Sequence, residues 1–167
     1  MQLKCMYKTG LGFDIHRLIK NKNKKLILGG AVIPSEFSLE AVSDGDVILH
    51  SISDAILGAA SSGDIGDFFP PSKKYLDMDS KEIIKFVLNK IREKFKIINI
   101  DTTIIVQKPR LSSYKKDILK SLKDIFDIED INVKIKSKEE LDILGGRNSI
   151  ACLSIVLLKN VAKNKNL

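Results

Sequence analysis

Three segments of the chain carry apolar residues at the spacing of an amphipathic α-helix. They predict helices from Asp46 to about Ser61, from Ser80 to about Phe95, and from Ser112 or Ser113 to about Phe126. Ser80 is expected to cap the second of these helices, and Asp44 or Gly45 to cap the first.

Alternating or β-branched apolar runs predict the strands. These runs occupy residues 2–16, 102–107, 132–136 and 150–158, and a hairpin is expected over Leu26–Pro34, where apolar residues flank two glycines. Residues 35–45 are expected to form a loop. The order of elements predicts an α+β (α/β) fold: a mixed four-stranded sheet, helices on one of its faces, and an added β-hairpin. Because the last strand is apolar, another subunit is expected to cover the other face.

Length and composition are those of one globular domain. The 167 residues, 44% of them apolar, predict a single domain over residues 1–160 and a polar tail over residues 161–167. Much of the formal charge of +7 lies in lysines mixed with asparagines rather than with aromatic residues, so a nucleic-acid-binding domain is not favoured. No apolar run reaches the roughly 18 residues of a membrane span. We therefore expect no membrane partner and a cytoplasmic protein, or a plastid protein if a transit peptide has been removed.

The chain has only two histidines, and both occur beside aspartates. Asp14 and His16 are two residues apart in a predicted strand, so their side chains share one face, while His50 lies on a predicted helix. Two imidazoles and a carboxylate suit tetrahedral zinc and leave a fourth position open for substrate. The alternative of two unrelated histidines is disfavoured by the glycines and aspartates around both. The carboxylates expected to orient the imidazoles are those of Asp44, Asp46 and Asp54.

Three other segments carry candidate chemistry, each with an ordinary alternative. Gly63–Gly66 either ends a helix or presents Asp64 to a substrate hydroxyl. Gln107–Ser112 leads from a strand into a helix N-terminus, a place that favours anions, although an ordinary turn is equally consistent with it. Glu139, after a predicted strand, offers oxygen ligands to a harder cation such as Mg²⁺.

With these residues in view, the chain resembles the family of 2-C-methyl-D-erythritol 2,4-cyclodiphosphate synthases of the non-mevalonate isoprenoid pathway. The likeness extends almost end to end in ordered motifs: Gly12–His16, Ser43–Val47 through His50, Asp54–Ala59, Gly63–Gly66 with Phe69-Pro70, Asp101–Pro109, and Ser149–Ala151. The resemblance implies a ferredoxin-like subunit in a homotrimer, with the sheets packed about the trimer axis and active sites between neighbouring subunits. It also implies a phosphorus–oxygen lyase that converts 4-diphosphocytidyl-2-C-methyl-D-erythritol 2-phosphate to the 2,4-cyclodiphosphate and releases CMP.

The resemblance also assigns roles to individual residues. Zinc, one per subunit, would be held by Asp14, His16 and His50, while Glu139 would help hold magnesium or manganese on the substrate diphosphate. Ser137 would stand at the position of a catalytic, phosphate-binding threonine. The cytidine diphosphate substrate would contact the following residues: Asp14, His16, Ser43, Asp64, Ile65, Gly66, Phe69, Val106, Gln107, Lys108, Pro109, Arg110, Leu111, Ser112, Lys136, Ser137, Glu139 and Arg147.

Two departures from the family pattern bear on catalysis. Val42 occupies the position of a family histidine that contacts phosphate, and a valine side chain donates no hydrogen bond. Loss of one such donor costs on the order of 10²–10³ in rate. Arg147 is one position out of register with the family arginine near the trimer axis. Two hypotheses therefore stand: a synthase, and a catalytically weakened trimeric protein that binds a nucleotide or an isoprenoid diphosphate. Survival of the whole metal triad favours the enzyme.

Overall fold

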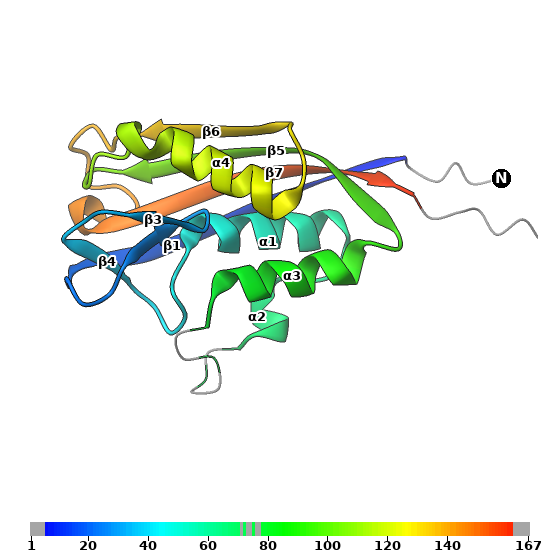
Figure 1. Cartoon of the computed structure of the whole chain (residues 1–167), viewed down its shortest axis with the longest axis horizontal. Helices are drawn as coiled ribbons and strands as arrows, with labels where there is room; N and C mark the ends of the chain where they lie inside the picture. The colour runs from blue at the N-terminus through cyan, green and yellow to red at the C-terminus, as the bar shows by residue number, and fades with distance from the viewer. Residues whose placement is uncertain (1–5, 71, 73–74, 76–77, 162–167) are drawn as a thin grey trace, which may run out of the picture.

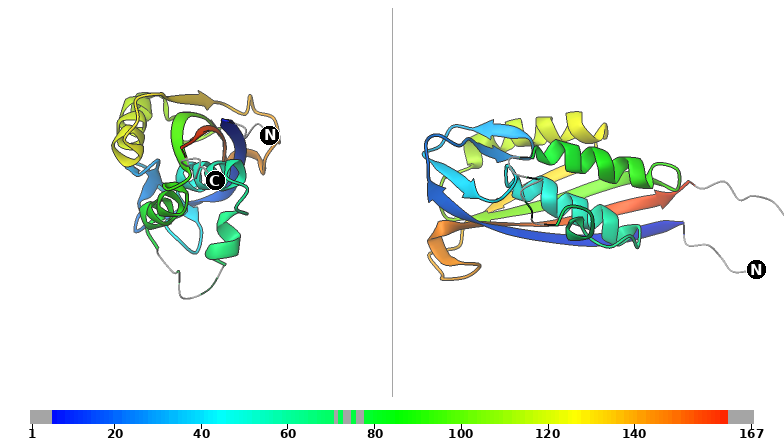
Figure 2. Two further views of the ribbon diagram at one scale, coloured as in Figure 1. Left: turned by 90° about the vertical axis from the view of Figure 1, so that its right-hand side faces the viewer. Right: turned by 90° about the horizontal axis from the view of Figure 1, so that it is seen from below.

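A five-stranded sheet with helices on one face forms the body of the protein (Figures 1 and 2). The computed structural model describes residues 6–70, 72, 75 and 78–161. The strand order is β4-β1-β7-β5-β6, and of these neighbours only β5 and β6 run parallel. The sheet strands are β1 (Tyr7–Lys20), β4 (Phe37–Glu40), β5 (Phe95–Val106), β6 (Ile131–Lys136) and β7 (Ser149–Asn160). The hairpin strands are β2 (Leu26–Leu28) and β3 (Ala31–Ile33), and the helices are α1 (Val47–Ala59), α2 (Ile65–Phe68), α3 (Ser80–Ile91) and α4 (Lys115–Phe126).

The predicted mixed sheet with helices on one face is confirmed, but it has five strands rather than four. The additional strand is β4, which lies in the segment expected to be a loop. It pairs antiparallel with the end of β1, where Arg17 is opposite Glu40. The predicted hairpin is present as a separate two-stranded sheet of β2 and β3. Short edge strands such as β4 carry too few residues for a periodicity to be recognised.

Two glycines bring α1 directly onto β1. A Cβ atom at Gly12 would lie 1.8 Å from the carbonyl oxygen of Ser51, and one at Gly10 would lie 2.0 Å from that of Ala55. No side chain fits between strand and helix at these points. Since alternate residues of a strand share a face, Asp14 and His16 lie on this same helix-facing side of β1.

The opposite face of the sheet exposes apolar residues along β1 and β7, while Asp101 of β5 and Lys134 of β6 form an ion pair on it. On β1, residues with odd numbers point to this face, and Leu11, Phe13 and Ile15 are 64%, 44% and 38% exposed. Ile155 of β7, which is opposite Leu11, is 49% exposed. Exposed apolar patches are typical of surfaces that contact a protein, a membrane or a ligand.

Several predicted boundaries differ from the observed ones. The cap of α1 is Asp46, which was expected inside the helix, and the cap of α3 is Asp79, one residue before the predicted Ser80. Helix α3, the second of the predicted helices, ends at Ile91 rather than near Phe95. The reason is that Phe95 already belongs to β5 and pairs with Asn160.

The third helical segment begins as a short 3₁₀ turn, η2 (Ser112–Tyr114), before α4. Residues 2–5 of the first predicted strand and residues 162–167 of the predicted tail lie outside the described residues. No helix in the described part of the chain has both the length and the apolar composition needed to span a membrane.

We predict that Gly12→Ala lowers the free energy of unfolding by about 3 kcal/mol, because the added methyl group forces α1 away from β1. Urea denaturation measures this change. Gly58→Ala is the matched control: Gly58 lies in α1, and nothing is within 4 Å of its added Cβ. That variant is expected to gain about 0.5–1 kcal/mol, the usual advantage of alanine over glycine in a helix. Equal effects of the two substitutions would contradict the close contact.

Candidate active site

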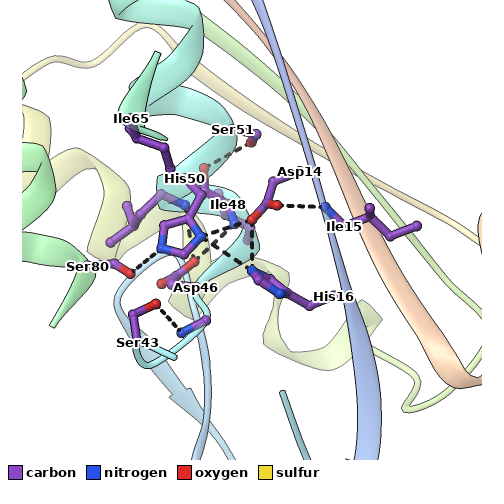
Figure 3. Close-up of polar contacts among 12 residues, drawn as sticks. Asp14, Ile15, His16, Ser43, Asp46, Ile48, His50, Ser51, Ile65 and Ser80 are labelled. Carbon is purple, nitrogen blue, oxygen red and sulfur yellow. Dashed lines mark hydrogen bonds and ion pairs between the residues drawn. The ribbon is translucent and has the colours of Figure 1, made fainter. Parts of the chain in front are cut away.

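Asp14, His16 and His50 converge where β1 meets the first turns of α1 (Figure 3). The Oδ2 atom of Asp14 lies 2.9 Å from Nδ1 of His50 and 3.0 Å from Nε2 of His16, and these two nitrogens are 3.4 Å apart. The other carboxylate oxygen of Asp14 accepts a hydrogen bond from the backbone N–H of Ile15 at 2.8 Å. One oxygen therefore fixes the carboxylate while the other faces both imidazoles.

The three ligand atoms fit a small tetrahedral metal ion. A zinc ion with bonds of about 2.0–2.1 Å separates its ligand atoms by about 3.3 Å, close to the observed triangle. His50 is 6% exposed, and Asp14 and His16 are partly exposed. The closed side of the site is thus formed by His50, and the open side is available to a substrate group.

Hydrogen bonds and charges within the triad shift the pKa values of Asp14 and His50 in opposite directions. Burial alone would raise the pKa of Asp14, but hydrogen bonds and attraction from His16 and His50 outweigh it and hold that pKa well below its usual range. Burial alone would lower the pKa of His50, yet the hydrogen bond and charge of Asp14 raise it above its ordinary value. The carboxylate of Asp14 is therefore ionised at neutral pH and offers a negatively charged oxygen to a cation.

Two of the three aspartates expected to orient the imidazoles make other bonds. The carboxylate of Asp46 accepts from four backbone N–H groups, those of Gly29, Gly30, Ile48 and Leu49. Burial raises its pKa to about 6, although the N–H groups oppose this shift. Asp54 accepts a hydrogen bond from the backbone N–H of Ile65 at 2.8 Å, and burial raises its pKa as well. These two aspartates fix the backbone around the site instead of the rings.

Asp44 reaches His50 only through a residue to which the sequence analysis gave no role in the site. That residue is Ser80, at the start of α3, whose hydroxyl oxygen lies 2.9 Å from Nε2 of His50 and also bonds to Asp44. Ser43 directly precedes Asp44 in the sequence, and its side-chain oxygen accepts a hydrogen bond from the backbone N–H of Gly45 at 3.1 Å. The only available clue to Ser80 was its position as a polar residue at a helix start.

A cavity of about 330 Å³ opens beside the triad. Of the predicted site residues, it is lined by His16, Val42, Ser43, His50, Ile65 and Phe69. Val42 therefore lines the same cavity as both histidines, although its side chain offers no hydrogen bond. The rest of the lining is mainly apolar.

A second cavity of about 210 Å³ lies at the end of β5. Its lining contains the predicted residues Val106, Gln107, Pro109, Arg110, Leu111, Ser112 and Ser137. Lys108 and Lys136, predicted with them, are exposed and do not line it. The two cavities have no lining residue in common among the described residues.

The segment after β6 is shaped by a buried lysine that the sequence did not indicate. Lys138 is 1% exposed, and its ammonium group donates to the carbonyl oxygens of Leu144 and Gly146, at 3.0 and 2.6 Å, and to the hydroxyl of Ser149. Its neighbours Ser137 and Glu139 are exposed and hydrogen-bonded to each other. The inward lysine therefore fixes the turn that presents these two side chains to solvent.

The remaining predicted residues are exposed. Arg147 forms an ion pair with Glu140. Asp64 is the cap of α2 and accepts a hydrogen bond from the backbone N–H of Asp67 at 3.1 Å, and Gly66 lies within that short helix. The segment Gly63–Gly66 thus follows the end of α1, as the helix-ending alternative expected, but its Asp64 also begins the short helix α2.

Comparison with known proteins places this arrangement in a family. A model of the YgbB family matches residues 7–159. The chain belongs to the YgbB family. This match and the synthase relatives described next confirm the resemblance recognised in the sequence. The matched range contains both cavities and the triad.

Relatives of known activity cover most of the chain. The 2-C-methyl-D-erythritol 2,4-cyclodiphosphate synthase of Treponema denticola is 44% identical over 155 residues, which are 90% of this chain and 95% of that protein. The synthase of the same name from Clostridium acetobutylicum is 46% identical over 90% of this chain and 99% of its own length. Among solved structures, the CDP complex of IspF from Plasmodium falciparum superposes with a TM-score of 0.80 at 34% identity, covering 92% of this chain and 96% of that one. These relatives match the chain as a whole and not just the motifs around the triad.

We predict that Asp46→Asn lowers the free energy of unfolding by about 2 kcal/mol or more, because the amide NH₂ would face a buried backbone N–H. Chemical denaturation measures the loss. Asp79→Asn is the control, since Asp79 is an exposed cap whose side chain accepts, among the described residues, only from the backbone N–H of Lys81, and asparagine caps a helix as well as aspartate does. A small effect at both positions would show that the four bonds to Asp46 are dispensable.

Proposed function

We propose that the chain converts 4-diphosphocytidyl-2-C-methyl-D-erythritol 2-phosphate to 2-C-methyl-D-erythritol 2,4-cyclodiphosphate and releases CMP, in non-mevalonate isoprenoid biosynthesis. The observation that carries the proposal is the triangle of Asp14, His16 and His50 beside a cavity, in a chain 44% and 46% identical to two synthases. In this reaction an oxygen of the 2-phosphate attacks the β-phosphorus, and the bond from that phosphorus to the CMP oxygen breaks. No protein nucleophile is needed, so the residues act by positioning and by neutralising charge.

The three triad residues would hold zinc, which when bound supplies a Lewis acid for a phosphate oxygen. Ser137 and Glu139 lie together on the exposed turn fixed by Lys138. The Ser137 hydroxyl would donate to a phosphate oxygen, and the Glu139 carboxylate would share a magnesium or manganese ion with the diphosphate. The second cavity, lined by residues 106, 107, 109–112 and 137, would take the cytidine; the likeness to a CDP complex supports this placement.

A complete active site would need a homotrimer. The two cavities share no lining residue among the described residues, and the exposed apolar residues of β1 and β7 offer the contact surface. Packing of that surface around a three-fold axis would bring one subunit's metal site beside the nucleotide site of its neighbour. Asp64, Gly66 and Arg147 would then meet substrate from exposed positions. The cytoplasm, or a plastid, is the location proposed with this activity.

The decisive experiment measures metal content and CMP release on the same purified protein. We expect about one zinc per subunit and turnover of the cytidine substrate to CMP and the cyclic diphosphate. Protein purified without chelators but lacking metal would contradict the site assignment. Zinc without CMP release would favour the alternative of a trimeric binding protein for a nucleotide or an isoprenoid diphosphate.

We predict that Val42→His increases the rate of CMP release by on the order of 10², the lower end of the usual value of one phosphate-facing donor. Val42 is 42% exposed and lines the cavity with His16, so a larger polar side chain has space there. Val32→His provides the control, because Val32 is an exposed valine of β3 that does not line the cavity. No gain from Val42→His would show that another group already replaces the family histidine.

A further inference from the structure

A chain of hydrogen bonds connects the start of α3 to the metal-binding histidine of α1 (Figure 3 shows its last link). The hydroxyl oxygen of Ser80 lies 2.9 Å from Nε2 of His50, and the same hydroxyl bonds to Oδ1 of Asp44. Oδ2 of Asp44 accepts from the backbone N–H of Ser80 at 3.0 Å. Ser80 is completely buried, so water does not compete for its hydroxyl.

The chemistry of the three groups sets the direction of these bonds. An ionised carboxylate only accepts hydrogen bonds, so the Ser80 hydroxyl donates its proton to Asp44. The oxygen of Ser80 then offers a lone pair to His50, and the ring must donate from Nε2. In a neutral imidazole with its proton on Nε2, the lone pair available for a metal is on Nδ1. Nδ1 is the atom that faces Asp14 and His16.

We propose that Ser80, held by Asp44, is a positioning residue that orients the His50 ring and keeps its proton on Nε2, so that Nδ1 is presented to the metal. This inference rests on the proposed metal site. It assigns to Ser80 and Asp44 together the function that a single carboxylate often has behind a metal-binding histidine.

Capping of α3 does not account for the Ser80 hydroxyl. The cap of that helix is Asp79, whose side chain accepts from the backbone N–H of Lys81 at 2.8 Å. The link between Asp44 and the start of α3 also has a backbone component, the N–H of Ser80, which remains when the side chain is shortened. Removal of the hydroxyl therefore removes the bond to His50 and leaves the helix start in place.

The test compares zinc affinity in Ser80→Ala and Ser80→Thr with that of the unchanged protein. Zn²⁺ alone is the probe, and competition with a chromophoric chelator gives the dissociation constant. We expect Ser80→Ala to weaken zinc binding by about 10- to 100-fold, the usual effect of losing such an outer partner. Ser80→Thr keeps the hydroxyl and is expected to restore the affinity to within about threefold of the unchanged protein.

A matched control separates this role from the general effect of losing a buried hydroxyl. Ser53 is a buried serine of α1, one turn from His50, whose hydroxyl has no hydrogen-bond partner among the described residues. Ser53→Ala should leave zinc affinity unchanged. Thermal melting of all variants without metal checks that each is folded before zinc is added.

The imidazole proton supplies a spectroscopic readout. With only two histidines in the chain, ¹⁵N-labelled histidine gives a spectrum with two ring systems to assign. In zinc-loaded protein, the Nε2 proton of His50 should be visible and slow to exchange in the unchanged protein and in Ser80→Thr, and lost to exchange in Ser80→Ala. Equal zinc affinities for Ser80→Ala and the unchanged protein would overturn this inference alone. Failure of the unchanged protein to bind zinc would overturn the metal site and this inference with it.

Discussion

The contact between β1 and α1 at two glycines determines where the site can form. Gly10 and Gly12 lie against the helix carbonyls of Ala55 and Ser51. This close contact fixes the position of β1 relative to α1. His50 directly precedes Ser51, and Asp14 follows Gly12 by one step along the same face of the strand. The triad is thus a result of backbone packing, which places the three side chains within reach of one another.

Polar groups around the start of α1 then hold this arrangement in place. Asp46 joins the helix to the β2–β3 hairpin through backbone N–H groups, and Asp44 joins it to α3. Each carboxylate is matched to several donors, as buried charges require. The exposed turn around Lys138 follows the same principle, with an ammonium group satisfied by two carbonyl oxygens and a hydroxyl. Rigid polar supports of this kind suit a reaction in which positioning is the main contribution of the protein.

Much of the site was predictable because its information is local. The spacing of Asp14 and His16 on a strand, and of His50 on a helix, indicated the triad, and ordered motifs indicated the family. Contacts between distant segments were not predictable. The Ser80 hydroxyl contacts His50 across 30 residues of sequence, and the Asp46 carboxylate accepts from the backbone N–H of Gly29 across 17 residues. Local patterns also cannot show that β4 pairs with β1, that Asp54 bonds to a backbone N–H instead of a ring, or that Lys138 turns inward.

The pairing of β1 with β7 has a consequence for how the protein is made. Asp14 and His16 are opposite Cys152 and Ile150, and β4 reaches β1 only from Arg17 onward. Asp14 and His16 therefore have no sheet partner until the last strand has been synthesised, on the order of ten seconds later on a ribosome. In a nascent chain that lacks β7, the segment of β1 that carries Asp14 and His16 has no neighbouring strand. The triad is consequently completed as a fixed arrangement only when the final strand joins the sheet.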